Sequence, residues 1–254
     1  MMLDPVVHLT DHEYSQVVGG AFADGADCPT MTVREWHDRM PVVYGILRGC
    51  DQVIKRAEWI GRPWLHIDHG YFQRGHFEGF YRISRNGLQA GGWSEADNTA
   101  PARWMNLRMR VKPWRAAGTH IVVVPPTGPV GSFYGIDAAA WLSVVMDELD
   151  RLTDRPVRVH TKSDETPFRM VLRDAWAVVG FNSNALVAAL LDGVPVFTLG
   201  PAATVPMGSR FLCEIERPLK PDREPWLWWL ANQQWRLDEI KSGAAWAALR
   251  ERQR

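Results

Sequence analysis

The sequence has no excess of charge of either sign. Its 254 residues include 29 Lys and Arg and 29 Asp and Glu, so the formal net charge is zero at pH 7. Proteins that coat nucleic acid or adhere to membranes use a net positive field, and this chain has none. The balance argues against a general DNA-coating role but leaves room for a local basic groove.

Cysteine is scarce. Cys28, Cys50 and Cys213 have no Cys-x-x-Cys spacing, which argues against a disulfide framework or a zinc site. The sequence also shows neither a secretory leader nor an apolar run of transmembrane length. We therefore expect free thiols, a soluble protein of the cytoplasm and no membrane partner.

Several nucleotide and hydrolase motifs are missing. There is no Gly-x-x-x-x-Gly-Lys-Ser/Thr loop and no Gly-x-Gly-x-x-Gly after a strand, so ATPases and dehydrogenases have no support. A Gly-x-Ser-x-Gly elbow is absent too. His66, His69 and His76 lack a recognised metal spacing, and no Asp-x-Asp occurs. We expect no metal and no required cofactor.

What is present is the composition of a globular protein, with 46% hydrophobic and 23% charged residues. The length suits two small domains. Short apolar runs alternate with helical patterns along the chain and predict an α/β fold. Residues 21–30 and 125–132 are expected to be loop and turn, and residues 224–233 and 242–250 terminal helices.

The segment from Ala175 to Leu199 is the most informative part of the chain. Residues 176–181 form an apolar run typical of a strand buried on both faces, and residues 194–199 form a second. Between them, Asn182-Ser183-Asn184 can cap a helix over residues 185–191. The capping turn then follows the carboxyl end of a parallel strand, where open α/β sheets bind ligands. The first amides of such a helix favour a phosphate. An ordinary strand–helix–strand crossover, with Asn and Ser only capping, is the alternative.

This segment resembles the donor-binding part of GT-B type glycosyltransferases, which place an Asn-Ser turn, a short helix and Gly-x-Pro-Val in this order. The match is Phe181-Asn182-Ser183-Asn184 with Asp192-Gly193-Val194-Pro195-Val196. Residues 223–227, 234–235 and 243–246 are also similar to compact phage-encoded members. Many relatives hold the donor ribose with a Glu where this chain has Ala188. That difference leaves open how the ribose would be bound.

The resemblance implies two Rossmann-like halves whose parallel sheets face an interdomain cleft. Residues 1–115 would bind the acceptor, and residues 116–254, with the terminal helices, the nucleotide sugar. The implied activity is transfer of a sugar, with a UDP-sugar as the expected co-substrate. For a phage-encoded member the location would be the host cytoplasm.

Three parts of the second half are candidates for donor binding. Besides the Asn182–Asn184 turn, Gly131 and Ser132 follow a predicted strand, where glycine would let amides approach phosphate. Lys162 follows the strand over residues 157–160 and offers a mobile point charge. A solvated lysine and an ordinary glycine turn are the alternatives.

The best candidates for catalysis are Asp68 and His69, which follow a predicted strand over residues 64–67. A carboxylate or imidazole there can remove a proton from an acceptor hydroxyl. Alternatively, Asp68 caps a turn and His69 bonds a main-chain carbonyl.

A basic cluster suggests one acceptor. Arg108 and Arg110 stand among other cations and two tryptophans, a pattern that can follow phosphates and stack on a base. Arg48, at the end of another strand, is a further candidate for a phosphate contact. In a phage-encoded member, as the resemblance implies, the acceptor would be a hydroxymethylated pyrimidine in DNA, whose phosphates these residues could follow. A solvated helix face with an interdomain linker is the alternative and the slightly favoured explanation of the cluster. The complete cluster is Arg103, Arg108, Arg110, Lys112 and Arg115.

Two other functions fit the same fold. A nucleotide-sugar epimerase or hydrolase would use several carboxylates around the sugar, and only Asp68, Asp164 and Glu165 are suitable. A non-catalytic nucleotide or nucleic-acid binder is the other, and Ala188 in place of Glu is its best support.

Overall fold

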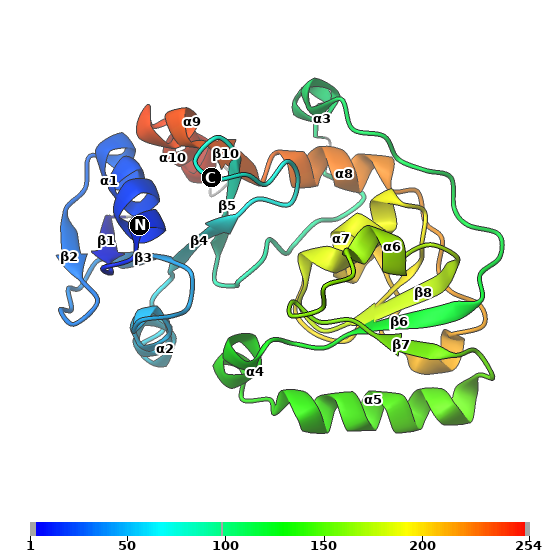
Figure 1. Ribbon diagram of the computed structural model, residues 1–254. Helices are drawn as coiled ribbons and strands as arrows, with labels where there is room; N and C mark the ends of the chain where they lie inside the picture. Colours follow the sequence, from blue (N-terminus) through cyan, green and yellow to red (C-terminus); the bar gives the residue numbers. More distant parts are fainter. Residues whose placement is uncertain (1–3, 98, 252–254) are drawn as a thin grey trace. The chain divides into compact units, whose positions relative to one another are not determined.

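The computed structural model describes residues 4–97 and 99–251. The chain forms two compact units (Figure 1). The first comprises the residues up to Ala90 together with those from Leu230 onward, and the second is Gly91–Trp229. Within the described ranges, no helix combines the length and apolar character that crossing a membrane requires.

The first unit is built on a six-stranded sheet in the order β10-β5-β4-β3-β1-β2. Strands β2, β1, β3 and β4 are parallel, whereas β5 is antiparallel to β4 and β10 is antiparallel to β5. The strands are β1 (Pro5–Leu9), β2 (Thr30–Thr32), β3 (Met40–Tyr44), β4 (Leu65–His69), β5 (Phe80–Arg85) and β10 (Gln234–Arg236).

Helices cover both faces of this sheet. The buried core on one face joins Val42 and Ile67 to Phe22 of α1 and Trp246 of α10, whose rings lie 5.8 Å apart. On the other face, α2 buries Val53 and Ile54. The helices are the π-helical η1 (Ser15–Gly19), α1 (Gly20–Ala26), α2 (Cys50–Trp59), α9 (Leu237–Lys241) and α10 (Ala244–Glu251).

The expected loop over residues 21–30 is wrong in its first half, which is helix α1. Gly20 and Gly25 lower helix propensity, but burial of Ala21 and Phe22 stabilises the helix. Gly25 has a packing role, because a Cβ there would lie 2.1 Å from the carbonyl oxygen of Ile240. Helix α1 can therefore approach the C-terminal segment closely only with glycine at this position.

The unit boundaries also differ from the expected division at residues 115 and 116. The C-terminal segment belongs to the first unit, because β10 pairs with β5 and α9 and α10 pack on α1. The expected helix over residues 242–250 is confirmed as α10, and β10 follows directly after α8 (Glu224–Ala231).

The second unit contains a four-stranded sheet in the order β7-β6-β8-β9, and all its strands are parallel. Its core joins Val123 and Val179 to Val145 and Leu149 of α5. The strands are β6 (His120–Val124), β7 (Val157–Val159), β8 (Ala175–Gly180) and β9 (Val196–Thr198). The helices are α3 (Ala102–Leu107), α4 (Gly128–Tyr134), α5 (Ala138–Leu152), α6 (Phe168–Val171) and α7 (Asn184–Leu191), with the short 3-10 helices η2 (Val205–Met207) and η3 (Leu212–Glu214).

We expect acid to destabilise the first unit through His66, a fully buried residue of β4. Burial lowers the pKa of His66 to about 4, whereas an unfolded histidine titrates near 6.5. As the pH falls from about 6.5 to 4, only the unfolded state gains this proton, so the free energy of unfolding decreases, by up to about 3 kcal/mol.

Urea unfolding of the wild-type protein and His66→Leu at pH 7, 6, 5 and 4 measures this contribution. The variant should lose less stability on acidification, and His37→Gln, which removes an exposed imidazole, is the control. Equal pH dependence of the wild type and His66→Leu would contradict the assignment.

Candidate functional site

The strand order of the second unit defines a preferred ligand position. In chain order, β7 is added to one side of β6, and β8 and then β9 are added to the other side. The direction in which strands are added therefore reverses between β6 and β8. Parallel α/β sheets bind ligands at the carboxyl ends of the strands that flank such a reversal. The last register pair of these strands is Val124 and Gly180, so the loops after them form the candidate donor site.

The expected strand–turn–helix–strand segment is confirmed as β8, α7 and β9. Ser183 is the N-cap of α7, with its backbone extended and its hydroxyl oxygen accepting the amide of Ala185 at 3.2 Å. The capping function is thus present. The Ser183 hydroxyl can still donate its own proton, because the capping bond uses only a lone pair.

The turn before α7 is tied to the loop after β9. The Asn182 side-chain amide donates to the carbonyl of Pro201. Gly200 packs directly on Phe181, since a Cβ on Gly200 would lie 2.4 Å from that ring. Asn184 is the first residue of α7 and half-buried. The three polar residues of the motif therefore lie together on a turn that neighbouring backbone holds in place.

Gly131 and Ser132 lie inside α4 and not in the expected turn. The amide of Gly131 donates to the carbonyl of Thr127 at 2.8 Å, so it is already used. A Cβ on Gly131 would lie 2.5 Å from the carbonyl oxygen of Ile136, which gives this glycine a packing role. Ser132 is exposed on the same short helix.

Sequence reasoning missed Thr127, which begins α4 at the carboxyl end of β6. Thr127 has the extended backbone of an N-cap, but its hydroxyl makes no capping bond. The sequence pattern that indicates this helix start is Thr127 followed by Gly128 and Pro129, because proline is favoured near the beginning of a helix. Lys162 is exposed in the turn after β7, the neighbour of β6. Both side chains follow strands at the same edge of the sheet as Ser183.

The basic cluster is divided between two roles. Lys112 and Arg115 both form ion pairs with Asp192, the C-cap of α7. The Arg115 guanidinium also donates to two carbonyls, at 2.6 and 2.9 Å. These cations therefore stabilise the carboxyl end of α7, where the helix dipole is negative. Arg108 and Arg110 are exposed after α3 and are the part of the cluster best able to meet phosphate.

In the first unit, Asp68 lies at the end of β4 with both carboxylate oxygens in use. One accepts from the Arg82 guanidinium at 2.6 Å and the other from the amide of His69 at 2.7 Å. Burial alone would raise the pKa of Asp68, but Arg82 and the His69 amide outweigh it and hold that pKa below its usual range. An ionised carboxylate held in this way is a weak base.

Arg82, which sequence reasoning also missed, organises this edge. Its Nε donates to the carbonyl of Leu88 at 3.0 Å and its Nη1 to the carbonyl of His69 at 2.7 Å. Its side chain is 7% exposed. The sequence could have indicated this role, because an arginine within the apolar run Phe80–Ile83 is expected to be buried, and a buried charge needs partners.

The His69 imidazole lies in an aromatic cluster at the carboxyl edge of the sheet. Its ring centroid is 5.0 Å from that of Tyr14 and 5.9 Å from that of Tyr81. The cluster consists of Tyr14, Tyr44, His69, His76, Phe77 and Tyr81. These rings surround the His69 imidazole and limit its movement.

The C-terminal segment also supports this edge. The Gln234 side-chain oxygen accepts the amides of Tyr71 and Phe72 at 2.8 and 3.0 Å. Arg48 follows β3 and forms an ion pair of 3.2 Å with Asp11, which follows β1. The two strands flank the reversal of strand order in this unit. Arg48 thus lies at the edge where sheets of this kind bind ligands, but with a carboxylate partner.

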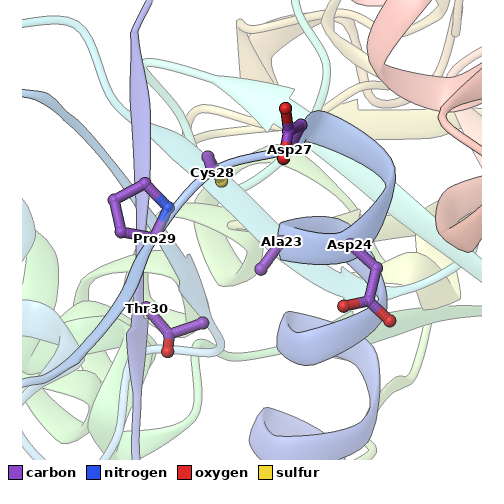
Figure 2. Close-up of a pocket in the computed structure, with 6 residues that line it drawn as sticks. All are labelled: Ala23, Asp24, Asp27, Cys28, Pro29 and Thr30. Carbon is purple, nitrogen blue, oxygen red and sulfur yellow. The ribbon is translucent and has the colours of Figure 1, made fainter.

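A cavity of about 600 Å³ lies elsewhere in the first unit (Figure 2). It is bordered by the end of α1 and the start of β2, and therefore lies toward the amino ends of the parallel strands. Asp24 and Asp27 would repel a phosphate, and burial raises the pKa of Cys28 to about 11. Among the described residues, no group of three His, Cys, Asp or Glu is placed to hold a metal. The lining residues are Ala23, Asp24, Asp27, Cys28, Pro29 and Thr30.

We expect Arg82→Gln to destabilise the protein by roughly 3 kcal/mol. Removing one partner of a buried ion pair costs about 3–5 kcal/mol, and the lower end applies because the Asp68 side chain is 34% exposed. Urea unfolding at pH 7 measures the loss. Arg85→Gln, on the exposed end of the same strand, should change stability little; a similar cost for both variants would contradict this role of Arg82.

No protein-family model matches the sequence, and no curated protein matches it. Among solved structures, the chain is similar to one described as Thermosulfurimonas dismutans KpsC, beta Kdo 2,4 transferase. The two share 11% sequence identity with a TM-score of 0.52, and the match covers 91% of each chain. The chain therefore has the α/β fold with two Rossmann-like units that is typical of GT-B glycosyltransferases.

Proposed function

We propose that this protein is a glycosyltransferase that moves a sugar from a nucleotide-sugar donor to an acceptor hydroxyl. Its similarity to a sugar transferase extends over both units, with 91% of each chain matched. The observation that carries the proposal is the position of Asn182-Ser183-Asn184. These residues begin α7 at the reversal of strand order, where α/β sheets bind ligands.

The second unit binds the donor in this proposal. The start of α7 offers a positive dipole end and the Ser183 hydroxyl to a phosphate. Lys162 is exposed at the same edge and can add a charge. Ala188 is half-buried in α7 and supplies no carboxylate to a ribose. A UDP-sugar is our first choice of donor, and a panel of nucleotides tests that choice.

The first unit binds the acceptor and supplies the base, and we assign that role to His69 before Asp68. The Asp68 oxygens already accept from Arg82 and the His69 amide. His69 would take the proton of the acceptor hydroxyl, and the oxygen would form its bond to the anomeric carbon. The bond from that carbon to phosphate would break, with its electron pair leaving on the nucleotide, and no metal is required.

Incubation with labelled nucleotide sugars tests the proposed function. Transfer requires an acceptor, epimerisation or hydrolysis proceeds without one, and a non-catalytic binder leaves the donor unchanged.

Assays with and without hydroxymethylated DNA test the DNA acceptor, which Arg108 and Arg110 motivate. If these residues follow phosphates, replacing both with Gln should flatten the dependence of log affinity on log salt by up to about two units.

We expect His69→Gln to lower turnover by roughly 10²–10⁴-fold, the usual effect of losing a general base. Donor affinity should be unchanged, because the base acts on the acceptor. Asp68→Asn is the comparison, because it keeps the shape of the side chain but weakens the contact with Arg82. It should lower the stability of the protein and reduce turnover less than His69→Gln does. Steady-state kinetics and thermal unfolding separate the two effects, and a larger loss of turnover in Asp68→Asn would return the base to Asp68.

Ser183→Ala tests the donor site. Losing the cap should cost about 1 kcal/mol of stability. If the hydroxyl also donates to a phosphate, UDP affinity should fall by roughly tenfold in addition. Calorimetry with UDP, GDP, CMP and ADP gives the affinity, with Ser242→Ala, an exposed serine after α9 in the first unit, as control. Unchanged nucleotide binding would leave Ser183 with its capping role alone.

A further inference from the structure

Two aromatic rings of α4 form a corner next to the candidate donor site. Tyr134, the last residue of α4, packs on Phe181 with the two ring centroids 5.6 Å apart. The ring of Phe133 stands almost perpendicular to that of Tyr134, at an interplanar angle of 89° and a centroid distance of 4.9 Å. Both side chains are half-buried, so part of each ring is open to a ligand. We call Phe133 and Tyr134 the aromatic corner.

The fold holds the aromatic corner in position. Gly135 ends α4 in the left-handed conformation, with a φ of 69°. The Ile136 amide then donates to the carbonyl of Gly131 at 2.8 Å, which closes the turn directly after Tyr134. Phe181, on which Tyr134 packs, is itself buried. Tyr134 is therefore placed before a ligand binds, which lowers the entropic cost of binding.

The aromatic corner is within reach of the candidate phosphate site. Phe181 directly precedes Asn182-Ser183, and two residues of chain separate the Cα atoms of Phe181 and Ser183 by at most about 7 Å. Tyr134 belongs to the segment after β6, and Ser183 to the segment after β8. These are the two strands that flank the reversal of strand order. A nucleotide bound at the reversal can thus contact Ser183 with its phosphate and Tyr134 with its base.

The charges at two helix starts favour this orientation of the nucleotide. Asp137, the N-cap of α5, follows three residues after Tyr134 and accepts the amide of Ala140 at 2.7 Å. The start of α5 therefore already has a carboxylate, whereas α7 has no acidic residue in its first turn. A phosphate is favoured at the start of α7 for that reason. A neutral base gains more from the aromatic surface of α4.

We propose that the aromatic corner binds the nucleobase of the donor by stacking. This inference rests on the proposed function, because it assigns a second part of the same donor site. Stacking of a base on an aromatic side chain raises affinity by roughly tenfold or more. The attraction comes from the ring, so the hydroxyl of Tyr134 is not required for it.

Calorimetry with nucleotides and a matched probe that lacks a base tests the proposal. UMP, CMP, AMP and GMP are compared with ribose 5-phosphate, which keeps the ribose and the phosphate. In the wild type, at least one nucleotide should bind roughly tenfold or more tightly than ribose 5-phosphate. Tyr134→Leu and Phe133→Leu should each reduce that preference by roughly fivefold or more, whereas Tyr134→Phe should retain it. Trp59→Leu, which removes a tryptophan that is 87% exposed in the first unit, is the control and should also retain it.

Each outcome decides the question. Equal binding of nucleotides and ribose 5-phosphate, absence of nucleotide binding, or a preference that survives both leucine variants of the aromatic corner would overturn the proposal. An equal loss of preference in Trp59→Leu would overturn it as well. Circular dichroism and the thermal midpoint verify that the variants fold, and Phe133→Leu decides the question if Tyr134→Leu does not.

Ser183→Ala separates this failure from failure of the proposed function. Ser183 would contact the phosphate that UMP and ribose 5-phosphate share, so its loss should weaken both by the same factor. If Ser183→Ala weakens both probes but neither leucine variant changes the preference, the donor site stands and the base binds elsewhere, which overturns this inference alone. A preference that depends on Tyr134 in a protein without sugar transfer would refute the transferase and keep the base site.

Discussion

The Arg82 guanidinium is the contact on which the candidate catalytic edge depends. From the middle of β5 it reaches the Asp68 carboxylate, the His69 carbonyl and the Leu88 carbonyl, and so joins the end of β4 to the chain that leaves the unit. A buried arginine is unfavourable unless its donors are used, and these three groups use them. The same contact lowers the basicity of Asp68. The His69 imidazole is positioned by the aromatic rings around it.

Helix α7 shows a similar separation of roles along one element. Its carboxyl end is satisfied by cations: Lys112 and Arg115 pair with Asp192, and Arg223 donates to the carbonyl of Leu190. Its amino end carries the Ser183 cap and no carboxylate in its first turn. The dipole of the helix therefore meets protein charges at one end and is available to an anion at the other. This asymmetry explains why a basic cluster in the sequence is a poor guide to where phosphate would bind.

The parts of the fold that could be predicted from the sequence are those set by local pattern. Segments β8, α7 and β9 follow from an apolar run, a capping turn and a second apolar run. The return of β10 to β5 could not be predicted, because that pairing joins segments separated by an entire unit. Helix α1 was not predicted, because its glycines lower helix propensity. At Gly25 the glycine is needed for close packing against the C-terminal segment. For the site, strand ends indicated Asp68, His69 and Ser183, whereas the role of Arg82 depends on carbonyls that only folding assembles.

The placement of β10 has a consequence for the order of events during synthesis. The second unit is one uninterrupted stretch, Gly91–Trp229, so all its strands have been made before β10 exists. The first unit must wait with β5 as an exposed edge, and Tyr71 and Phe72 lack the Gln234 acceptor until β10 has been made. Unpaired strand edges are the surfaces through which nascent chains associate wrongly. The unit with the candidate base can therefore pair β10 with β5 only after every residue of the unit with the candidate donor site has been made.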